Sequence, residues 1–159
     1  MTFHRSPFLT AAIALGLASC AQPARQAAAP ETPVAAEKKP VRMNSRGKIT
    51  SISLTDLFAL QQADQVLLYD ARPGFFYSLG HLPGAISLPK SADCDAQITR
   101  REAEIKAALA AKKTIVIYCT NLACPDARTV AIHLAGFGYS SSTLTGGWEA
   151  WKESGLPTE

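Results

Sequence analysis

Apolar residues occur in short runs after residue 47, and their spacing predicts alternating strands and helices. "KITSISL" (48–54) alternates apolar and polar residues, as a half-buried strand does. "QVLLYDA" (65–71) and "TIVIYC" (114–119) are almost continuously apolar, which is typical of strands buried on both faces. "AISLP" (85–89) predicts a further short strand, and "SSTLTGGWEAWKESGLP" (141–157) predicts a last strand followed by a helix with Trp148 and Trp151.

Three further segments carry helical signals. "SLTD" (53–56) is a helix start with Leu57, Phe58 and Leu60 on the apolar face. "TRRE" (99–102) has the form of a capping box, so we expect a helix to about Ala111 with Ile105 and Leu109 on one face. A third helix is expected from Asp126 to Phe137, and its inward-facing residues are Ala127, Val130, Ala131 and Leu134.

Strands that alternate with helices predict an α/β domain with a mainly parallel sheet. Ligands bind beyond the carboxyl ends of the strands in such sheets. "TIVIYC" ends at Cys119, and the segment "YCTNLACPDAR" (118–128) therefore lies where a site is expected, between a buried strand and the start of a helix.

Charge is distributed unevenly along the 159 residues. The formal net charge is +3, but residues 1–47 have six basic and two acidic residues, and the remaining residues have 10 basic and 11 acidic ones. The predicted domain therefore has no basic surplus, and its charge does not support nucleic-acid binding.

The first residues resemble an export signal. Arg5 precedes an apolar stretch, Phe8 to Leu17, that is too short to cross a bilayer as a helix, and "LASC" ends at Cys20. This resembles a bacterial lipobox, which implies a signal peptide over 1–19 and a lipid on Cys20, with an ordinary secretory signal as the alternative. Ala21 favours the outer membrane over the inner one, so we expect a lipid-anchored protein facing the periplasm.

Residues 20–47 are rich in Ala, Pro and polar side chains and have almost no large apolar residues. Such a segment cannot bury enough apolar surface to offset the entropy of ordering, so it is predicted to be a disordered tether. Residues 48–159 are predicted to form one domain.

Three segments of this domain together resemble the rhodanese family. "LLYDARPGFFYSLGHLPGAISLP" (67–89) has the Asp–x–Arg and Gly–His–Leu–Pro–Gly–Ala pattern of that family, and "IVIYC" resembles its active-site strand and cysteine. "HLAGFGYSSSTLTGGWEAWKESGLP" (133–157) resembles its Gly–Tyr, Gly–Gly–Trp and Gly–Leu–Pro ending. The resemblance implies a three-layer domain with a five-stranded, mainly parallel sheet and helices on both faces.

The resemblance also implies roles for individual residues. Cys119 falls at the nucleophile that accepts a sulfane sulfur as a persulfide and passes it to a thiol or cyanide. The active-site loop would then comprise Thr120, Asn121, Leu122 and Ala123, with Arg128 beyond it. Structural motif positions of the family fall on Asp70, Arg72, His81 and Gly84, and the turn beside the loop falls on Gly146, Gly147 and Trp148.

The loop departs from the commonest family pattern at Cys124. Many members have a basic residue five positions after the nucleophile, whereas Arg128 stands nine positions after Cys119 and within the expected helix. The loop therefore lacks the basic residue that grips the substrate in many members, and the predicted enzyme class remains a thiosulfate sulfurtransferase-like one. Cys124 could resolve a persulfide or sulfenate on Cys119, form a stable disulfide with it, or be inert.

The remaining candidate groups do not suggest a cofactor. His81 and His133 have no second ligand at metal spacing, so neither a metal nor a cofactor is expected. Cys94 lies in polar "SADCDAQ" and is expected to be an exposed, unpaired thiol, with pairing to Cys119 or Cys124 as the alternative.

The predicted function is that of a sulfurtransferase or persulfide carrier acting on a small sulfur compound. Two alternatives stay open: a non-catalytic binding module, and a thiol-redox protein with a Cys119–Cys124 disulfide. The sequence does not name a protein partner, a donor or an acceptor.

Overall fold

A computed structural model describes residues 46–159. The predicted signal peptide, the predicted lipidation site Cys20 and the predicted tether up to residue 45 lie outside the described residues. No helix within residues 46–159 is both long and apolar enough to cross a membrane.

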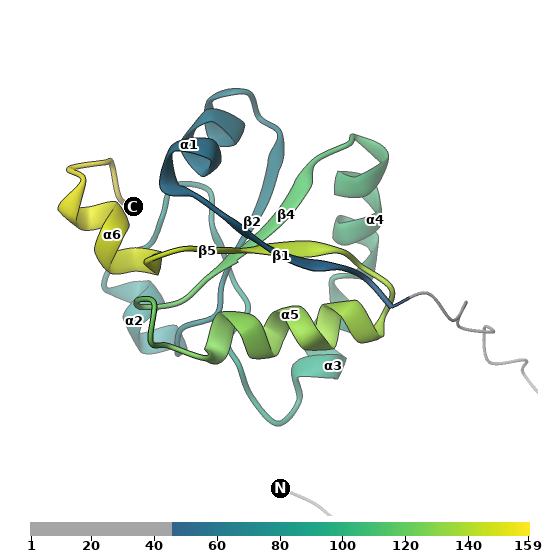
Figure 1. The fold of residues 1–159 in the computed structure, drawn as a ribbon. Coiled ribbons are helices and arrows are strands. Elements are labelled where there is room, and N and C mark those ends of the chain that lie inside the picture. Colours follow the sequence, from purple (N-terminus) through teal and green to yellow (C-terminus); the bar gives the residue numbers. More distant parts are fainter. Residues whose placement is uncertain (1–45) are drawn as a thin grey trace, which may run out of the picture. The chain divides into compact units, whose positions relative to one another are not determined.

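Five strands form one parallel sheet in the order β1-β5-β4-β2-β3. Figure 1 shows β1, β5, β4 and β2 in the middle of the domain, with helices around them. Every predicted strand is present, and the bounds are β1 (Ile49–Ile52), β2 (Val66–Asp70), β3 (Ile86–Ser87), β4 (Thr114–Tyr118) and β5 (Ser141–Leu144). The most apolar strands, β2 and β4, are neighbours near the middle of the sheet, where both faces are covered.

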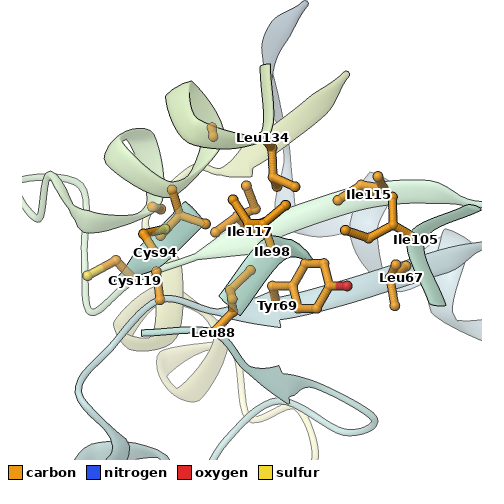
Figure 2. Close-up of a cluster of buried hydrophobic side chains, with 14 of the residues drawn as sticks. Leu67, Tyr69, Leu88, Cys94, Ile98, Ile105, Ile115, Ile117, Cys119 and Leu134 are labelled. Atoms are coloured by element: carbon orange, nitrogen blue, oxygen red, sulfur yellow. The ribbon is translucent and has the colours of Figure 1, made fainter. Parts of the chain in front are cut away.

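Alternate residues of β2 and β4 enter two different hydrophobic cores. Tyr69 and Ile117 belong to a core on one face, which is closed by α3 (Cys94–Arg100), α4 (Glu102–Ala110) and α5 (Asp126–Gly136) (Figure 2). Leu68 and Val116 belong to a core on the other face, beneath α1 (Leu54–Gln62) and α6 (Gly147–Glu153). The predicted three-layer α/β fold is therefore confirmed.

Two of the helical predictions are also confirmed. Ser53 caps α1, because its hydroxyl accepts a hydrogen bond from the Asp56 amide at 3.1 Å. All four residues predicted to face inward on α5 are buried, namely Ala127, Val130, Ala131 and Leu134. The turn-rich segment after β2 contains one short helix, α2 (Gly74–Ser78).

The region between β3 and β4 differs from the prediction. "TRRE" is not a capping box, because Thr99 lies inside α3 and donates its hydroxyl hydrogen to the Asp95 carbonyl, while α4 begins without a side-chain cap. Leu109 is exposed, and the buried face of α4 is formed by Ile105 and Ala108. Helix α3, which precedes α4, was not predicted because Cys94 stands among polar residues. Cys94 is the first residue of α3 and its side chain is buried.

Candidate active site at the carboxyl end of β4

Cys119 is the first residue after β4, and the loop 120–125 connects it to α5. The carboxyl ends of all five parallel strands meet at this edge of the sheet. Cys119 itself is only 3% exposed and belongs to the core beneath α5 (Figure 2). Leu122, at the tip of the loop, is 79% exposed. The loop therefore runs from the core to the surface and back within a few residues.

Cys119 and Cys124 are joined by a disulfide, with their Cα atoms 6.1 Å apart. This distance lies within the range that a disulfide requires. Cys124 is half-buried against the same core as Cys119. In the described state neither sulfur is a free thiolate, so nucleophilic chemistry at Cys119 requires the disulfide to be opened first.

Asn121 organises the short loop between the two cysteines. Its side-chain oxygen accepts a hydrogen bond from the Ala123 amide at 3.1 Å, and its carbonyl accepts one from the Cys124 amide at 3.2 Å. Its side-chain amide donates to Glu149 at 3.0 Å, which ties the loop to α6. The amides of residues 120–122 have no protein acceptor within residues 46–159, so they remain available to an anion.

The turn that begins α6 packs directly on the loop. The Trp148 amide donates to the Cys119 carbonyl at 2.8 Å, and the Glu149 amide donates to the Thr120 carbonyl at 2.9 Å. Gly147 is buried with a φ of +58°, and a Cβ atom there would overlap the Cys119 carbonyl. The close approach of the two segments therefore depends on glycine at position 147.

A buried ion pair is hydrogen-bonded to Tyr118, the residue before Cys119. Asp70 at the end of β2 and Arg72 are 0% and 2% exposed, and the Arg72 guanidinium lies 2.6 Å from a carboxylate oxygen of Asp70. The Tyr118 hydroxyl donates to the same carboxylate at 2.6 Å, as the register of the parallel strands, which pairs Asp70 with Tyr118, allows. The network thus fixes the residue that immediately precedes Cys119.

The electrostatics of this network raise the pKa values of Arg72 and Tyr118. Burial acts to lower the pKa of Arg72, but its hydrogen bonds and charge attraction to Asp70 outweigh burial, and the pKa is raised. Burial, together with the negative charge of Asp70, raises the pKa of Tyr118 well above its usual range. Arg72 also lies 4.4 Å from the Trp148 ring centroid, so the network reaches the turn that holds the Cys119 carbonyl.

His81 and Gly84 lie in the loop before β3 and do not line the cavity beside Cys119 and Cys124. The His81 ring stacks on Tyr77 with ring centroids 3.9 Å apart, and its Nδ1 atom lies 3.1 Å from the Tyr77 carbonyl oxygen. Gly84 adopts a φ of +70°, and its amide donates to the Glu159 carboxylate at 3.0 Å. Both residues order the connection to β3.

A cavity of about 300 Å³ opens beside the disulfide. Both cysteines line the cavity, together with residues of the loop between them. The carboxyl ends of β1 and β5 and the first turn of α5 form the rest of its wall. Arg128 lies on α5 and not in the loop itself, and it is the one charged residue among those that line the cavity. The sequence located the cysteines but gave no signal for Ser51, Thr143 and Thr145, which β1 and β5 bring to the same cavity.

Cys94 is a buried free thiol and not the exposed one that its polar neighbours predicted. It is 1% exposed and lies in the same core as Cys119 (Figure 2). Burial raises the pKa of the Cys94 thiol, and the nearby charges of Asp95 and Asp93 raise it further. Cys94 is therefore a weak nucleophile at neutral pH.

One group of metal-ligand side chains occurs in the described part of the chain. The sulfur atoms of Cys119 and Cys124 and a carboxylate oxygen of Asp126 lie within 4.8 Å of one another. The two sulfurs are bonded to each other, so in this state they do not offer the thiolates that a soft metal ion would need.

Tyr118 is the structural residue that sequence reasoning missed. A usable signal existed, because the residue before Cys119 ends the strand next to "LLYD", and parallel pairing brings the two strand ends together. Glu149 gave no comparable signal, since only the packing of α6 against the loop brings its carboxylate to Asn121.

Comparisons with known proteins agree with this fold. A helix-turn-helix transcriptional regulator of Mycobacterium tuberculosis is 33% identical over 112 residues, and these cover 69% of this chain and 44% of that protein. This chain thus matches less than half the length of that relative.

Solved structures give the same result. A protein from Bacillus halodurans has 26% identity and a TM-score of 0.57, with 69% of this chain and 76% of that chain covered. A thiosulfate sulfurtransferase from Pseudomonas aeruginosa has 24% identity and a TM-score of 0.51, with 70% and 20% covered, which supports the fold alone. Residues 53–154 match the family described as the rhodanese-like domain. The chain therefore belongs to the rhodanese-like domain family.

Proposed function

We propose that this protein is a sulfurtransferase or persulfide carrier that moves a sulfane sulfur through Cys119 to a thiol or cyanide acceptor. The observation that carries the proposal is the position of Cys119 at the end of a central parallel strand, beside a cavity and within a loop with three available amides. These are the features that a nucleophilic thiolate and a charged persulfide require.

The reaction begins from the dithiol. A dithiol reductant opens the Cys119–Cys124 disulfide and is itself oxidised to a disulfide. The Cys119 thiolate then attacks the outer sulfur of the donor. The bond between the two donor sulfurs breaks, and the inner part of the donor leaves with the electron pair, which leaves a persulfide on Cys119. An acceptor thiolate or cyanide attacks the outer sulfur of that persulfide and regenerates the Cys119 thiolate.

Cys124 offers a second reaction by which the persulfide on Cys119 can break down. Its sulfur can attack the inner sulfur of the Cys119 persulfide, because the two side chains already reach each other. The products are the Cys119–Cys124 disulfide and hydrosulfide, with the thiol proton of Cys124 leaving on the hydrosulfide. On this account the disulfide is the resting state after sulfide release.

Thiocyanate formation from a sulfane donor and cyanide tests the proposal. The reduced protein should be active, and Cys119→Ser should abolish the activity. Cys124→Ser should retain turnover and no longer need a reductant, while Cys94→Ser serves as the matched control because Cys94 is buried and unpaired. Equal activity in Cys119→Ser and the parent protein would contradict the proposed role of Cys119.

A non-catalytic binding module is the second candidate. It is favoured by the disulfide and by the 3% exposure of Cys119, which together would keep the sulfur out of reach. A disulfide that survives treatment with a dithiol under native conditions, with no sulfur transfer afterwards, would support this candidate. A thiol-redox protein would instead reduce or oxidise a partner thiol without acquiring extra sulfur.

The location proposed for this activity is the periplasmic side of a membrane, with the domain attached through a lipid on Cys20. Outer-membrane attachment is preferred over inner-membrane attachment because Ala21 follows the cysteine. Membrane partitioning of the Cys20→Ala variant tests the anchor. The variant should move to the soluble periplasmic fraction, and its retention in membranes would contradict lipidation.

A further inference from the structure

Three metal-ligand side chains meet where β4, the cysteine loop and α5 join. The Sγ atoms of Cys119 and Cys124 and a carboxylate oxygen of Asp126 lie within 4.8 Å of one another. The strand end, the loop and the helix thus each contribute one ligand atom. In a tetrahedral zinc site, with bonds of about 2.3 Å to sulfur and about 2.1 Å to oxygen, the ligand atoms are about 3.6 to 3.8 Å apart. The three side chains can reach these distances by rotation once the disulfide is open.

The Asp126 carboxylate has no hydrogen-bond or ion-pair partner within residues 46–159, although the residue is half-buried. The helix dipole favours an acid in the first turn of α5, but it does not require two sulfur atoms beside that acid. A carboxylate that loses part of its water is normally compensated by a hydrogen-bond donor or a cation. A bound cation would supply the missing partner of Asp126.

Opening the disulfide increases the need for a cation. Cys119 and Cys124 become thiols, and a cysteine binds a metal only as its thiolate. Two thiolates and the Asp126 carboxylate would place three negative charges within 4.8 Å of one another, where like charges disfavour ionisation. A divalent cation between these atoms removes most of the repulsion and binds the thiolates directly.

The ligand types limit the choice of ion. Thiolates favour Zn²⁺ and Cu⁺ over Mg²⁺ and Ca²⁺, which take oxygen ligands. The carboxylate favours Zn²⁺ over Cu⁺, because Zn²⁺ binds thiolates and carboxylates in the same site. Three protein ligands leave one tetrahedral position open. The cavity of about 300 Å³ that both cysteines line gives water or a small ligand access to this position.

We propose that the reduced protein binds one Zn²⁺ ion through the Cys119 and Cys124 thiolates and the Asp126 carboxylate. This inference goes beyond the proposed function, because it holds whether or not Cys119 carries sulfur.

Binding proceeds in two balanced steps. A dithiol reductant opens the Cys119–Cys124 disulfide and is itself oxidised to a disulfide. Zn²⁺ then replaces the two thiol protons, which pass to the solvent, and neither the ion nor the sulfurs change oxidation state in this step. The bound ion occupies both sulfurs, so it competes with disulfide formation and with sulfur transfer.

Metal titration of the full chain tests the site. In a Cys20→Ala background the remaining cysteines are Cys94, Cys119 and Cys124. The chain is reduced with a dithiol, the reductant is removed without air, and Co²⁺ is added as a spectroscopic substitute that Zn²⁺ then displaces. We expect one ion per chain, release of about two protons per ion, and sulfur-to-cobalt charge-transfer absorption. The oxidised chain is the internal control and should show none of these signals, because its disulfide withholds both thiolates.

Substitutions identify the ligands. Changing a residue that only supports a ligand costs about 10- to 100-fold in metal affinity, so loss of a ligand should cost at least as much. Cys119→Ser and Cys124→Ser should each weaken Zn²⁺ binding by about 100-fold or more, and Asp126→Asn by about 10-fold or more. Cys94→Ser should leave the affinity unchanged, because Cys94 lies outside the group. Asp95→Asn is the matched control for the carboxylate, since Asp95 is also an acid in the first turn of a helix.

The possible outcomes are distinct. Binding that Asp126→Asn weakens and Asp95→Asn does not weaken supports the site with three ligands. Equal affinity in Asp126→Asn and the parent protein would overturn it and leave only chelation by two thiols. Absence of binding, or cobalt spectra without sulfur charge transfer, would also overturn it in a reduced protein that circular dichroism shows to be folded. Persulfide formation by the metal-free reduced protein tests the proposed function separately, so either idea can fail while the other holds.

Discussion

Removing one partner of the buried Asp70–Arg72 ion pair should destabilise the protein far more than removing one partner of an exposed pair. Nitrogen and oxygen atoms are 2.6 Å apart both in this pair and in the pair of Lys113 with Asp64. The side chains of the first pair are 3% and 0% exposed, whereas Asp64 is 89% exposed. The pairs thus differ in burial and in hydrogen bonding, because Asp70 accepts from the backbone amide and guanidinium of Arg72 and from Tyr118, whereas Asp64 accepts from the Lys113 ammonium.

Asp70→Asn removes the negative charge but keeps the shape of the side chain. Arg72 would then be a buried cation without a counter-ion, with the amide oxygen at position 70, the Gly80 carbonyl and two aromatic rings as its remaining partners. Breaking one side of a buried pair costs about 3–5 kcal/mol. The total stability of a domain of this size is about 5–15 kcal/mol, so the variant should lose a large part of it.

Urea denaturation of the parent protein, Asp70→Asn and Asp64→Asn measures the two effects. Asp64→Asn should cost less than about 1 kcal/mol, and asparagine tolerates the φ of 51° at that position. The double variant Asp70→Asn/Arg72→Met should recover part of the loss, because it removes the stranded cation. The reasoning is refuted if Asp70→Asn and Asp64→Asn destabilise the protein equally, or if the double variant is no more stable than Asp70→Asn.

Three other predictions follow from the structure. Gly147→Ala should destabilise the protein by about 2 kcal/mol or more and slow sulfur transfer, because it forces a Cβ atom against the Cys119 carbonyl; Gly155→Ala, at a similar φ of +68° but in open space, is the control. In a Cys20→Ala background, a thiol reagent should modify Cys94 slowly in the folded oxidised protein and rapidly after unfolding, and fast native modification would contradict its burial. The pKa of Tyr118 is higher in the folded protein than its ordinary value of about 10, so the protonated hydroxyl stabilises the fold fully below pH about 10. This stabilisation is lost as the pH rises further. The melting temperature should therefore fall above pH about 10, and it should fall less steeply in Tyr118→Phe.

Much of the fold could be predicted from the sequence because local patterns and global packing agree. The apolar runs of β2 and β4 indicate strands buried on both faces, and the inward-facing residues of α5 follow helical spacing. The position of Cys119 followed from these patterns, since a central parallel strand must end at the edge where sites form.

The segment between β3 and β4 could not be predicted in the same way. Cys94 stands among polar residues, and only Cys94 and Ile98 of α3 are buried, so the helix has little periodic signal. Its stability comes from packing against the core, which a sequence pattern of seven residues does not show. The prediction of a capping box at "TRRE" was wrong for a related reason. Helix α4 begins without a side-chain cap, so tertiary packing determines where it begins.

The cavity was also beyond sequence reasoning. Ser51 and Thr145 are 94 positions apart, and they meet only because β1 and β5 are hydrogen-bonded neighbours in the sheet. Arg128 could be placed on a helix from the sequence, but the space that it lines depends on these distant strand ends.

Intact-protein mass spectrometry of the reduced chain after incubation with a sulfane donor tests the central claim most directly. We predict a gain of about 32 Da, the mass of one sulfur atom, that maps to the peptide containing Cys119. The gain should persist in Cys124→Ser and disappear in Cys119→Ser. A reduced protein that gains no mass, or one whose added sulfur remains after Cys119→Ser, would contradict the account of Cys119 as the sulfur carrier.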